Sequence, residues 1–144
     1  MPDPAALGPA LVLVPLLGAV AAFAAPRLGG ALTLIAGIPV LGLVAVLLAG
    51  SDAVPVYHAG GWMAPLGIRL RGDPLALVML TLSALVMAVA GVYARAYYGD
   101  RGGPPSGFWP LWLFLWGALN AVFLSGDIFN LYVCLELMAL AAVS

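Results

Sequence analysis

The stretch PLALVMLTLSALVMAVAGVYARAYY, residues 74–98, decides the class of this chain. It is apolar almost throughout, and its only charged residue, Arg95, lies near its end. A helix that crosses about 30 Å of hydrocarbon needs about 20 consecutive, mostly apolar residues. The stretch exceeds that length, so it predicts a membrane-spanning helix.

The composition extends this prediction to the whole chain. Of its 144 residues, 65% are hydrophobic and 8% are charged, whereas a soluble domain has about 45–50% apolar and about 25% charged residues. The formal net charge is −1, so no basic surface favours nucleic acid. We therefore expect a multi-pass protein of the cell (inner) membrane, surrounded by the lipid bilayer, that binds no nucleic acid.

Four more apolar stretches resemble the first and predict an all-α integral membrane fold with about five transmembrane helices. They form a single membrane domain over residues 1–144, with helices at about 7–25, 30–50, 74–98, 108–124 and 127–144. The stretch nearest the N-terminus, residues 7–25, is preceded by Asp3 and by no lysine or arginine. We therefore interpret it as a retained helix and not as a signal peptide. Asp127 is predicted to be the N-cap of the last helix.

The polar insertion at about residues 53–72 predicts a short β-hairpin between the second and third helices. Its two β-prone runs, 54–57 and 68–71, flank a turn signal at Gly60 and Gly61. The single histidine, His58, lies in this insertion. We interpret it as an incidental loop residue.

The arginines predict the orientation. An odd number of crossings places Arg27, Arg95 and Arg101 on one side and Arg69 and Arg71 on the other. Basic residues are enriched in cytoplasmic loops. The count therefore favours an extracytoplasmic N-terminus and an extracytoplasmic hairpin.

Other residues in the apolar stretches predict packing features. Pro15 and Pro39 lie in mid-span, where neighbouring helices can satisfy the carbonyls that proline leaves free. Asn120 is expected to make a helix–helix contact. Phe108 and Trp109 are typical of an aromatic belt at headgroup level.

Glu136 is the candidate functional residue. It lies nine residues beyond Asp127, which is about 13.5 Å along a helix and close to the bilayer midplane. An ionised acid there costs about 2.5–3.5 kcal/mol and is by default a functional hypothesis. Burial would favour the neutral form, whereas a cation or a water file would favour the ionised form, and a group poised between the two can carry a proton. The structural alternative is a protonated side chain that hydrogen-bonds across a helix interface.

Tyr132, four residues earlier, shares the helical face of Glu136 and could hydrogen-bond its carboxylate. The chain contains no lysine, so a basic partner for Glu136 must come from other sequence. The chain has no phosphate-binding loop after a strand, no HxxxH or CxxC spacing and no Ser/His/Asp set. We therefore predict no cofactor, no metal and no enzymatic activity of its own.

Two stretches resemble a known family: GGWMAPLGIRLRGDPLALVML, residues 60–80, and SGDIFNLYVCLELM, residues 125–138. They are similar to the N-terminal part of the antiporter-like membrane subunits of Mrp-type cation/proton antiporters, membrane-bound hydrogenases and respiratory complex I, and most similar to the D-type subunit of Mrp antiporters. The resemblance implies that Glu136 matches the family glutamate that takes part in ion translocation. It also implies a lysine partner on a later helix of a longer chain.

Three functions remain open at this point. The first is a membrane subunit of a multisubunit monovalent cation (Na⁺ or K⁺)/proton antiporter, a transporter subunit that contributes a proton-translocating glutamate and assembles with other membrane subunits. The second is a proton-channel subunit of a redox-driven complex of the complex I or hydrogenase kind. The third is a non-transporting membrane scaffold that uses Glu136 only for helix packing.

Overall fold

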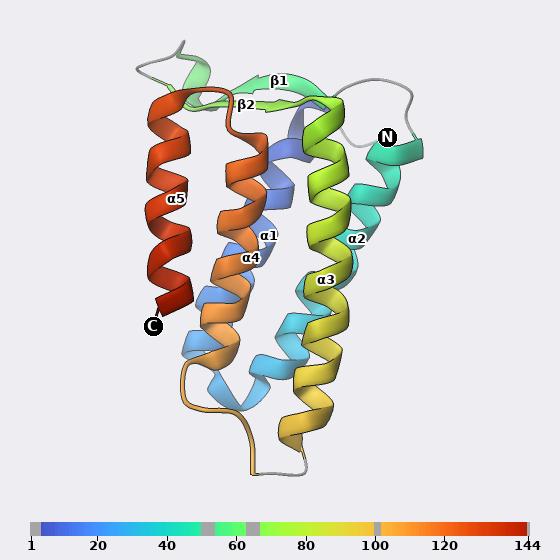
Figure 1. Cartoon of the computed structure of the whole chain (residues 1–144), viewed down its shortest axis with the longest axis vertical. Coiled ribbons are helices and arrows are strands. Elements are labelled where there is room, and N and C mark those ends of the chain that lie inside the picture. Colours follow the sequence, from blue (N-terminus) through green and yellow to red (C-terminus); the bar gives the residue numbers. More distant parts are fainter. Residues whose placement is uncertain (1–3, 50–53, 63–66, 100–101, 144) are drawn as a thin grey trace.

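A computed structural model describes residues 4–49, 54–62, 67–99 and 102–143 of the chain. Figure 1 shows helices that run alternately up and down, with a small sheet across one end. In chain order the elements are α1 (Pro4–Ala24), η1 (Pro26–Leu28), α2 (Gly29–Ala49), β1 (Val54–His58), η2 (Ala59–Gly61), β2 (Arg69–Gly72), α3 (Pro74–Gly99), α4 (Phe108–Leu124) and α5 (Ile128–Val143). The prediction of five long helices and a two-stranded hairpin is confirmed.

Within the described residues, three segments are long and apolar enough to cross a membrane: Ala6–Ala24, Pro26–Ala49 and Pro74–Gly99. Helices α4 and α5 are also apolar but shorter, with 17 and 16 residues. At 1.5 Å per residue they rise about 25 Å and about 24 Å. They lie alongside the three longer segments, with α5 at the edge of the bundle next to α4 (Figure 1).

Proline in the middle of α1 is accommodated by α4. Pro15 has no N–H, so the carbonyl of Leu11, four residues earlier, loses its helical partner. The side-chain amide of Asn120 donates a hydrogen bond of 2.9 Å to this carbonyl. Asn120 and Leu11 are both almost fully buried, so the bond forms in the interior of the bundle. The predicted helix–helix contact of Asn120 thus gives the Leu11 carbonyl a side-chain donor in place of the missing backbone N–H.

Glycines allow the helices to approach closely. A Cβ atom added to Gly117 on α4 would lie 2.8 Å from the Leu16 side chain of α1. A Cβ atom added to Gly29 would lie 2.8 Å from Trp109. Small residues at such positions are common in membrane bundles, where van der Waals packing drives helix association.

The tryptophans of α4 pack inward. Trp109 is 7% exposed and Trp116 is 1% exposed, and both rings lie against glycines of α2. Trp109 therefore faces the interior of the bundle and not the lipid, because Gly29 and Gly30 leave room for its indole, and the aromatic belt at headgroup level stays a prediction. Phe108 is only partly buried and stacks with Trp112 and Tyr98 in an aromatic cluster at this end.

The hairpin lies across the other end of the bundle, near the start of α5 (Figure 1). Its strands are antiparallel, and Tyr57 pairs with Leu70 and His58 with Arg69. Part of the predicted hairpin, residues 53 and 63–66, lies outside the described residues.

Candidate functional site

The candidate site is on α5, and its N-terminal end is tied to the hairpin. Asp127 caps the helix, because its Oδ1 accepts a hydrogen bond of 2.7 Å from the backbone N–H of Asn130. The other carboxylate oxygen, Oδ2, accepts a hydrogen bond of 3.1 Å from the backbone N–H of Arg69 in β2. The N–H of Gly126 also donates to the carbonyl of Arg69, at 2.8 Å. One carboxylate therefore fixes α5 to the sheet, and the predicted N-cap is confirmed.

The face of α5 that packs into the bundle carries Asn130, Cys134 and Ala141, which are all buried. The side-chain amide of Asn130 donates to the Ser125 hydroxyl at 3.1 Å, and the Cys134 thiol donates to the Asn130 side-chain oxygen at 3.6 Å. The polar side chains on this face therefore satisfy one another. Cys134 is a free, buried packing residue.

Glu136 and Tyr132 lie on the opposite, exposed face. The Tyr132 hydroxyl and the Glu136 carboxyl group lie one helical turn apart on this face, near enough to interact electrostatically. Tyr132 is 62% exposed and Leu140 is 63% exposed, and Glu136 between them is also exposed. The i, i+4 spacing thus brings the two predicted site residues together, on a surface that helices α1–α4 leave uncovered.

The arrangement determines what this acid can contact. Glu136 lies nine residues, about 13.5 Å, along the helix from Asp127, yet it faces away from the interior of this bundle. Its neighbours on the same face are Tyr132, Val133, Ala139 and Leu140, all exposed. A group outside the described helices can therefore reach the carboxylate directly.

The remaining polar candidates lie elsewhere. His58 and Arg69 are paired in the hairpin, on a different element from Glu136. Over residues 4–49, 54–62, 67–99 and 102–143, no group of three or more His, Cys, Asp and Glu side chains could hold a metal ion.

Sequence reasoning missed one polar feature. At the end of the bundle opposite the hairpin, a cavity between α2 and α3 is lined by Arg27 and Arg95. In the sequence the arginines indicate only orientation. Arg27 and Arg95 are far apart in the sequence, so the sequence does not indicate that the antiparallel helices bring both residues to the same cavity.

Curated proteins with similar sequences include three membrane subunits. The chain is 36% identical over 118 residues, 80% of its length, to the D-type subunit of a probable K⁺/H⁺ antiporter of Rhizobium meliloti. It is 34% identical over 121 residues, 75% of its length, to the D-type subunit of the Na⁺/H⁺ antiporter of Alkalihalophilus pseudofirmus. It is 36% identical over 142 residues, 92% of its length, to the N-type subunit of the NADH-quinone oxidoreductase of Desulforudis audaxviator. No protein-family model matches the chain.

Two solved structures have a similar fold. A chain of the Mrp complex from a Dietzia species matches 99% of this chain with a TM-score of 0.71 and 27% sequence identity, over 27% of its own length. A chain of the membrane-bound sulfane sulfur reductase, an archaeal respiratory membrane complex, matches 94% of this chain with a TM-score of 0.72 and 23% identity, over 29% of its own length. The second match is one of fold alone.

The fold and the apolar helices define a multi-helix chain with the architecture of the corresponding part of these membrane subunits. More particularly, the chain is related to the D-type subunits of Mrp antiporters and to the N-type subunit of NADH-quinone oxidoreductase, which confirms the resemblance predicted from the sequence. The chain spans between 21% and 28% of the lengths of the three curated relatives.

Proposed function

We propose that this chain provides part of a monovalent cation/proton antiporter subunit, in which Glu136 takes up and releases protons. The observation that carries the proposal is the position of Glu136 on the uncovered face of α5, with Tyr132 one turn earlier on the same face. An acid buried in the bundle would exchange protons only through rearrangement of packed helices. On this face a water file or a basic side chain from another element can contact it directly.

Tyr132 has a positioning role in this proposal. Its hydroxyl is a single donor or acceptor, so it can donate to the ionised carboxylate or accept from the neutral acid. It would hold the carboxyl group in place as the proton is exchanged. The relatives named as Na⁺/H⁺ and K⁺/H⁺ antiporter subunits support a monovalent cation as the counter-ion.

The substitution Glu136→Gln tests the proposal in the complete protein, assembled with its membrane partners. Glutamine keeps the shape of the side chain but does not titrate. We expect near-complete loss of cation-dependent proton flux in vesicles, with assembly retained. Leu135→Gln, at an adjacent exposed position of α5, is the matched control and should keep its flux. Wild-type flux in Glu136→Gln would favour the scaffold function and overturn the proposal.

The proposed orientation places the hairpin outside and the turn at Pro26–Leu28 in the cytoplasm. Cysteines introduced at His58 and Ser106, in a chain whose Cys134 is replaced by alanine, would report it. We expect a membrane-impermeant maleimide to label position 58 in intact cells and position 106 only after permeabilisation. The reverse pattern would invert the topology but leave the role of Glu136 untouched.

A second function is favoured by one specific match. The alignment with the N-type subunit of NADH-quinone oxidoreductase extends over 92% of this chain, more than either antiporter alignment described above. In a redox-driven complex, Glu136 would carry protons coupled to electron transfer in other subunits. Proton movement that requires quinone reduction and ignores Na⁺ and K⁺ gradients would identify this function.

A further inference from the structure

A groove runs along the outside of the bundle between α2 and α3. Its first part is a cavity of about 430 Å³ where α2 begins and α3 ends, lined by residues that include Arg27, Gly30, Arg95, Tyr98 and Trp109. Its second part is a cavity of about 240 Å³ further along the same two helices, lined by residues that include Thr33, Leu34, Gly37, Leu41, Met87 and Gly91. The lining positions follow one another along both helices, so the two cavities lie one after the other from the end of the bundle toward its middle.

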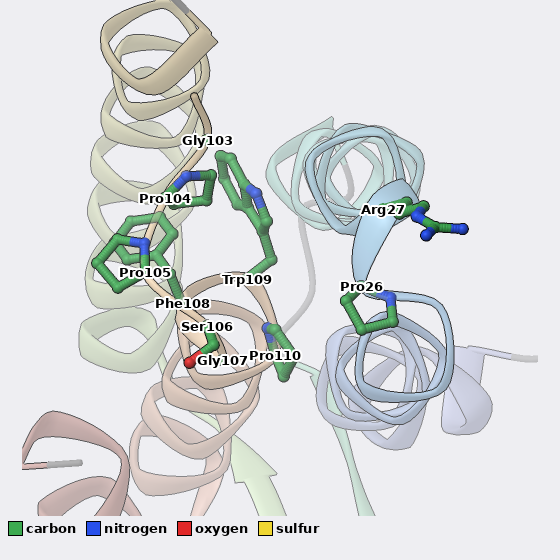
Figure 2. Close-up of a pocket in the computed structure, with 10 residues that line it drawn as sticks. All are labelled: Pro26, Arg27, Gly103, Pro104, Pro105, Ser106, Gly107, Phe108, Trp109 and Pro110. Carbon is green, nitrogen blue, oxygen red and sulfur yellow. The ribbon is translucent and has the colours of Figure 1, made fainter. Parts of the chain in front are cut away.

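The first part of the groove is cationic. The Nη1 atom of Arg95 lies 3.5 Å from the position that a Cβ atom of Gly30 would occupy, so its guanidinium group crosses from α3 to the start of α2. Arg27 is exposed, and Figure 2 shows its guanidinium group pointing away from the loop at 103–107, so its long side chain is free to turn toward a bound anion. Among the described residues that line this cavity none is acidic. The neighbouring Asp100 and Arg101 lie outside the described residues.

Aromatic side chains enclose this cationic end. Trp109 lies between the cavity in Figure 2, lined by the 103–107 loop, and the cavity that contains Arg95, because it lines both. Tyr98 stacks edge-to-face on Phe108 at the same end. Aromatic rings and arginines at the ends of transmembrane helices lie at the level of the lipid headgroups.

The second part of the groove is apolar and has glycines in its floor. A Cβ atom at Gly37 would meet the ring of Trp116 at 3.4 Å, and one at Gly91 would meet Trp112 at 3.5 Å, so the rings of α4 lie directly behind both glycines. Exposed Ile38 and Val92 line its sides. From Gly30 to Leu41 the groove extends about 16 Å, which is about half of the hydrocarbon thickness and therefore the depth of one leaflet.

We propose that the α2–α3 groove binds an anionic phospholipid of the surrounding bilayer. The lipid phosphate is held by Arg95 and Arg27, and one acyl chain lies along Gly37 and Gly91. Basic pockets between membrane helices bind anionic headgroups. A free phosphate ion would use only the cationic end, whereas the apolar continuation, at the depth of one leaflet, matches a lipid.

The complete protein in its native complex, reconstituted into nanodiscs, tests the proposal. Native mass spectrometry would count the lipids retained from phosphatidylcholine alone and from phosphatidylcholine mixed with phosphatidylglycerol. We expect preferential retention of phosphatidylglycerol, which Arg95→Gln reduces by about five-fold. Val92→Trp should also reduce it, because the added ring fills the groove.

Two matched controls accompany these variants. Arg71→Gln removes an exposed arginine of the hairpin, and Val89→Trp adds the same ring at an exposed position of α3 that does not line the groove. Both should retain phosphatidylglycerol like the wild type. Equal retention of the two lipids, or equal losses in the control variants, would overturn the proposal. If inorganic phosphate displaced the phosphatidylglycerol and Val92→Trp retained this lipid like the wild type, the groove would be a site for a soluble anion. That result would also overturn the proposal.

Discussion

The side chain of Asn120 donates a hydrogen bond of 2.9 Å to the backbone carbonyl of Leu11, 109 residues earlier in the chain. This carbonyl is the group that Pro15 deprives of its helical partner. An unpaired carbonyl in a bilayer has no water to satisfy it. Proline in α1 and asparagine in α4 therefore form one structural unit.

The Asn120–Leu11 bond predicts a dependence between two substitutions. Asn120→Leu should destabilise the folded protein by about 1–2 kcal/mol, because it leaves the Leu11 carbonyl unpaired in the bundle. Pro15→Ala restores an N–H for this carbonyl, so Asn120→Leu should cost less in that background. A double-mutant cycle on reversible unfolding in mixed micelles measures the difference. Equal costs in both backgrounds would show that the hydrogen bond does not depend on the proline.

The contact between α1 and α4 predicts that Gly117 tolerates no side chain. Gly117→Ala would place a methyl group 2.8 Å from Leu16 and 3.3 Å from the Val12 carbonyl, so we expect a loss of about 1–3 kcal/mol from overpacking. Gly42→Ala is the control, because a Cβ atom there meets nothing within 4 Å. It should be neutral or slightly stabilising. Thermal unfolding of both variants in the same detergent decides the comparison.

Asp127 is predicted to stabilise the protein through two elements at once. Asp127→Ala removes the cap of α5 and the acceptor for the Arg69 N–H, and it should cost about 1–2 kcal/mol. Hydrogen exchange at the Arg69 amide should also be faster in Asp127→Ala than in the wild type. Asp73→Ala is the control: Asp73 caps α3 through the Ala76 N–H at 2.8 Å. If Asp73→Ala accelerated exchange at Arg69 as much, the link between hairpin and α5 would not depend on Asp127.

Tyr132 is predicted to tune Glu136 without being essential. Tyr132→Phe removes the hydroxyl nearest to Glu136 on its helical face and keeps the ring, so we expect proton flux to fall several-fold, by less than in Glu136→Gln. The measurement is cation-dependent proton flux in vesicles, compared between the wild type, Tyr132→Phe and Glu136→Gln at one pH. Phe129→Leu, at another exposed position of α5, should leave the flux unchanged.

Much of the fold follows from local properties of the sequence. The partition of an apolar stretch into a bilayer depends on its length and composition, so residues 74–98 alone predict a membrane helix. The cap at Asp127 and the hairpin at 54–72 are local as well, because turn and capping signals act over a few residues. The i, i+4 relationship of Tyr132 and Glu136 is also a property of any helix.

The faces of the helices could not be predicted in this way. Helices α2 and α4 are apolar all round, so their sequences do not indicate which side packs. Trp109 illustrates this limit: its type and position suggest a headgroup belt, yet Gly29, on another helix, provides the space that buries it. The partner of Leu11 was equally hidden, because the mid-span proline indicates a free carbonyl but not the residue that satisfies it.

By itself, then, the sequence determined that the chain forms long apolar helices, about where they begin and end, and that Tyr132 and Glu136 share a helical face, because each depends on residues that are near one another in the chain. Tertiary structure alone decided that Glu136 faces away from α1–α4, that Asn120 satisfies Leu11, and that Arg27 and Arg95 meet at one groove. The physical reason is that packing brings together residues that are far apart in sequence. In an apolar chain, the shapes of the side chains and a few buried polar groups decide which helix faces pack together. The pattern of hydrophobic residues alone does not indicate these faces.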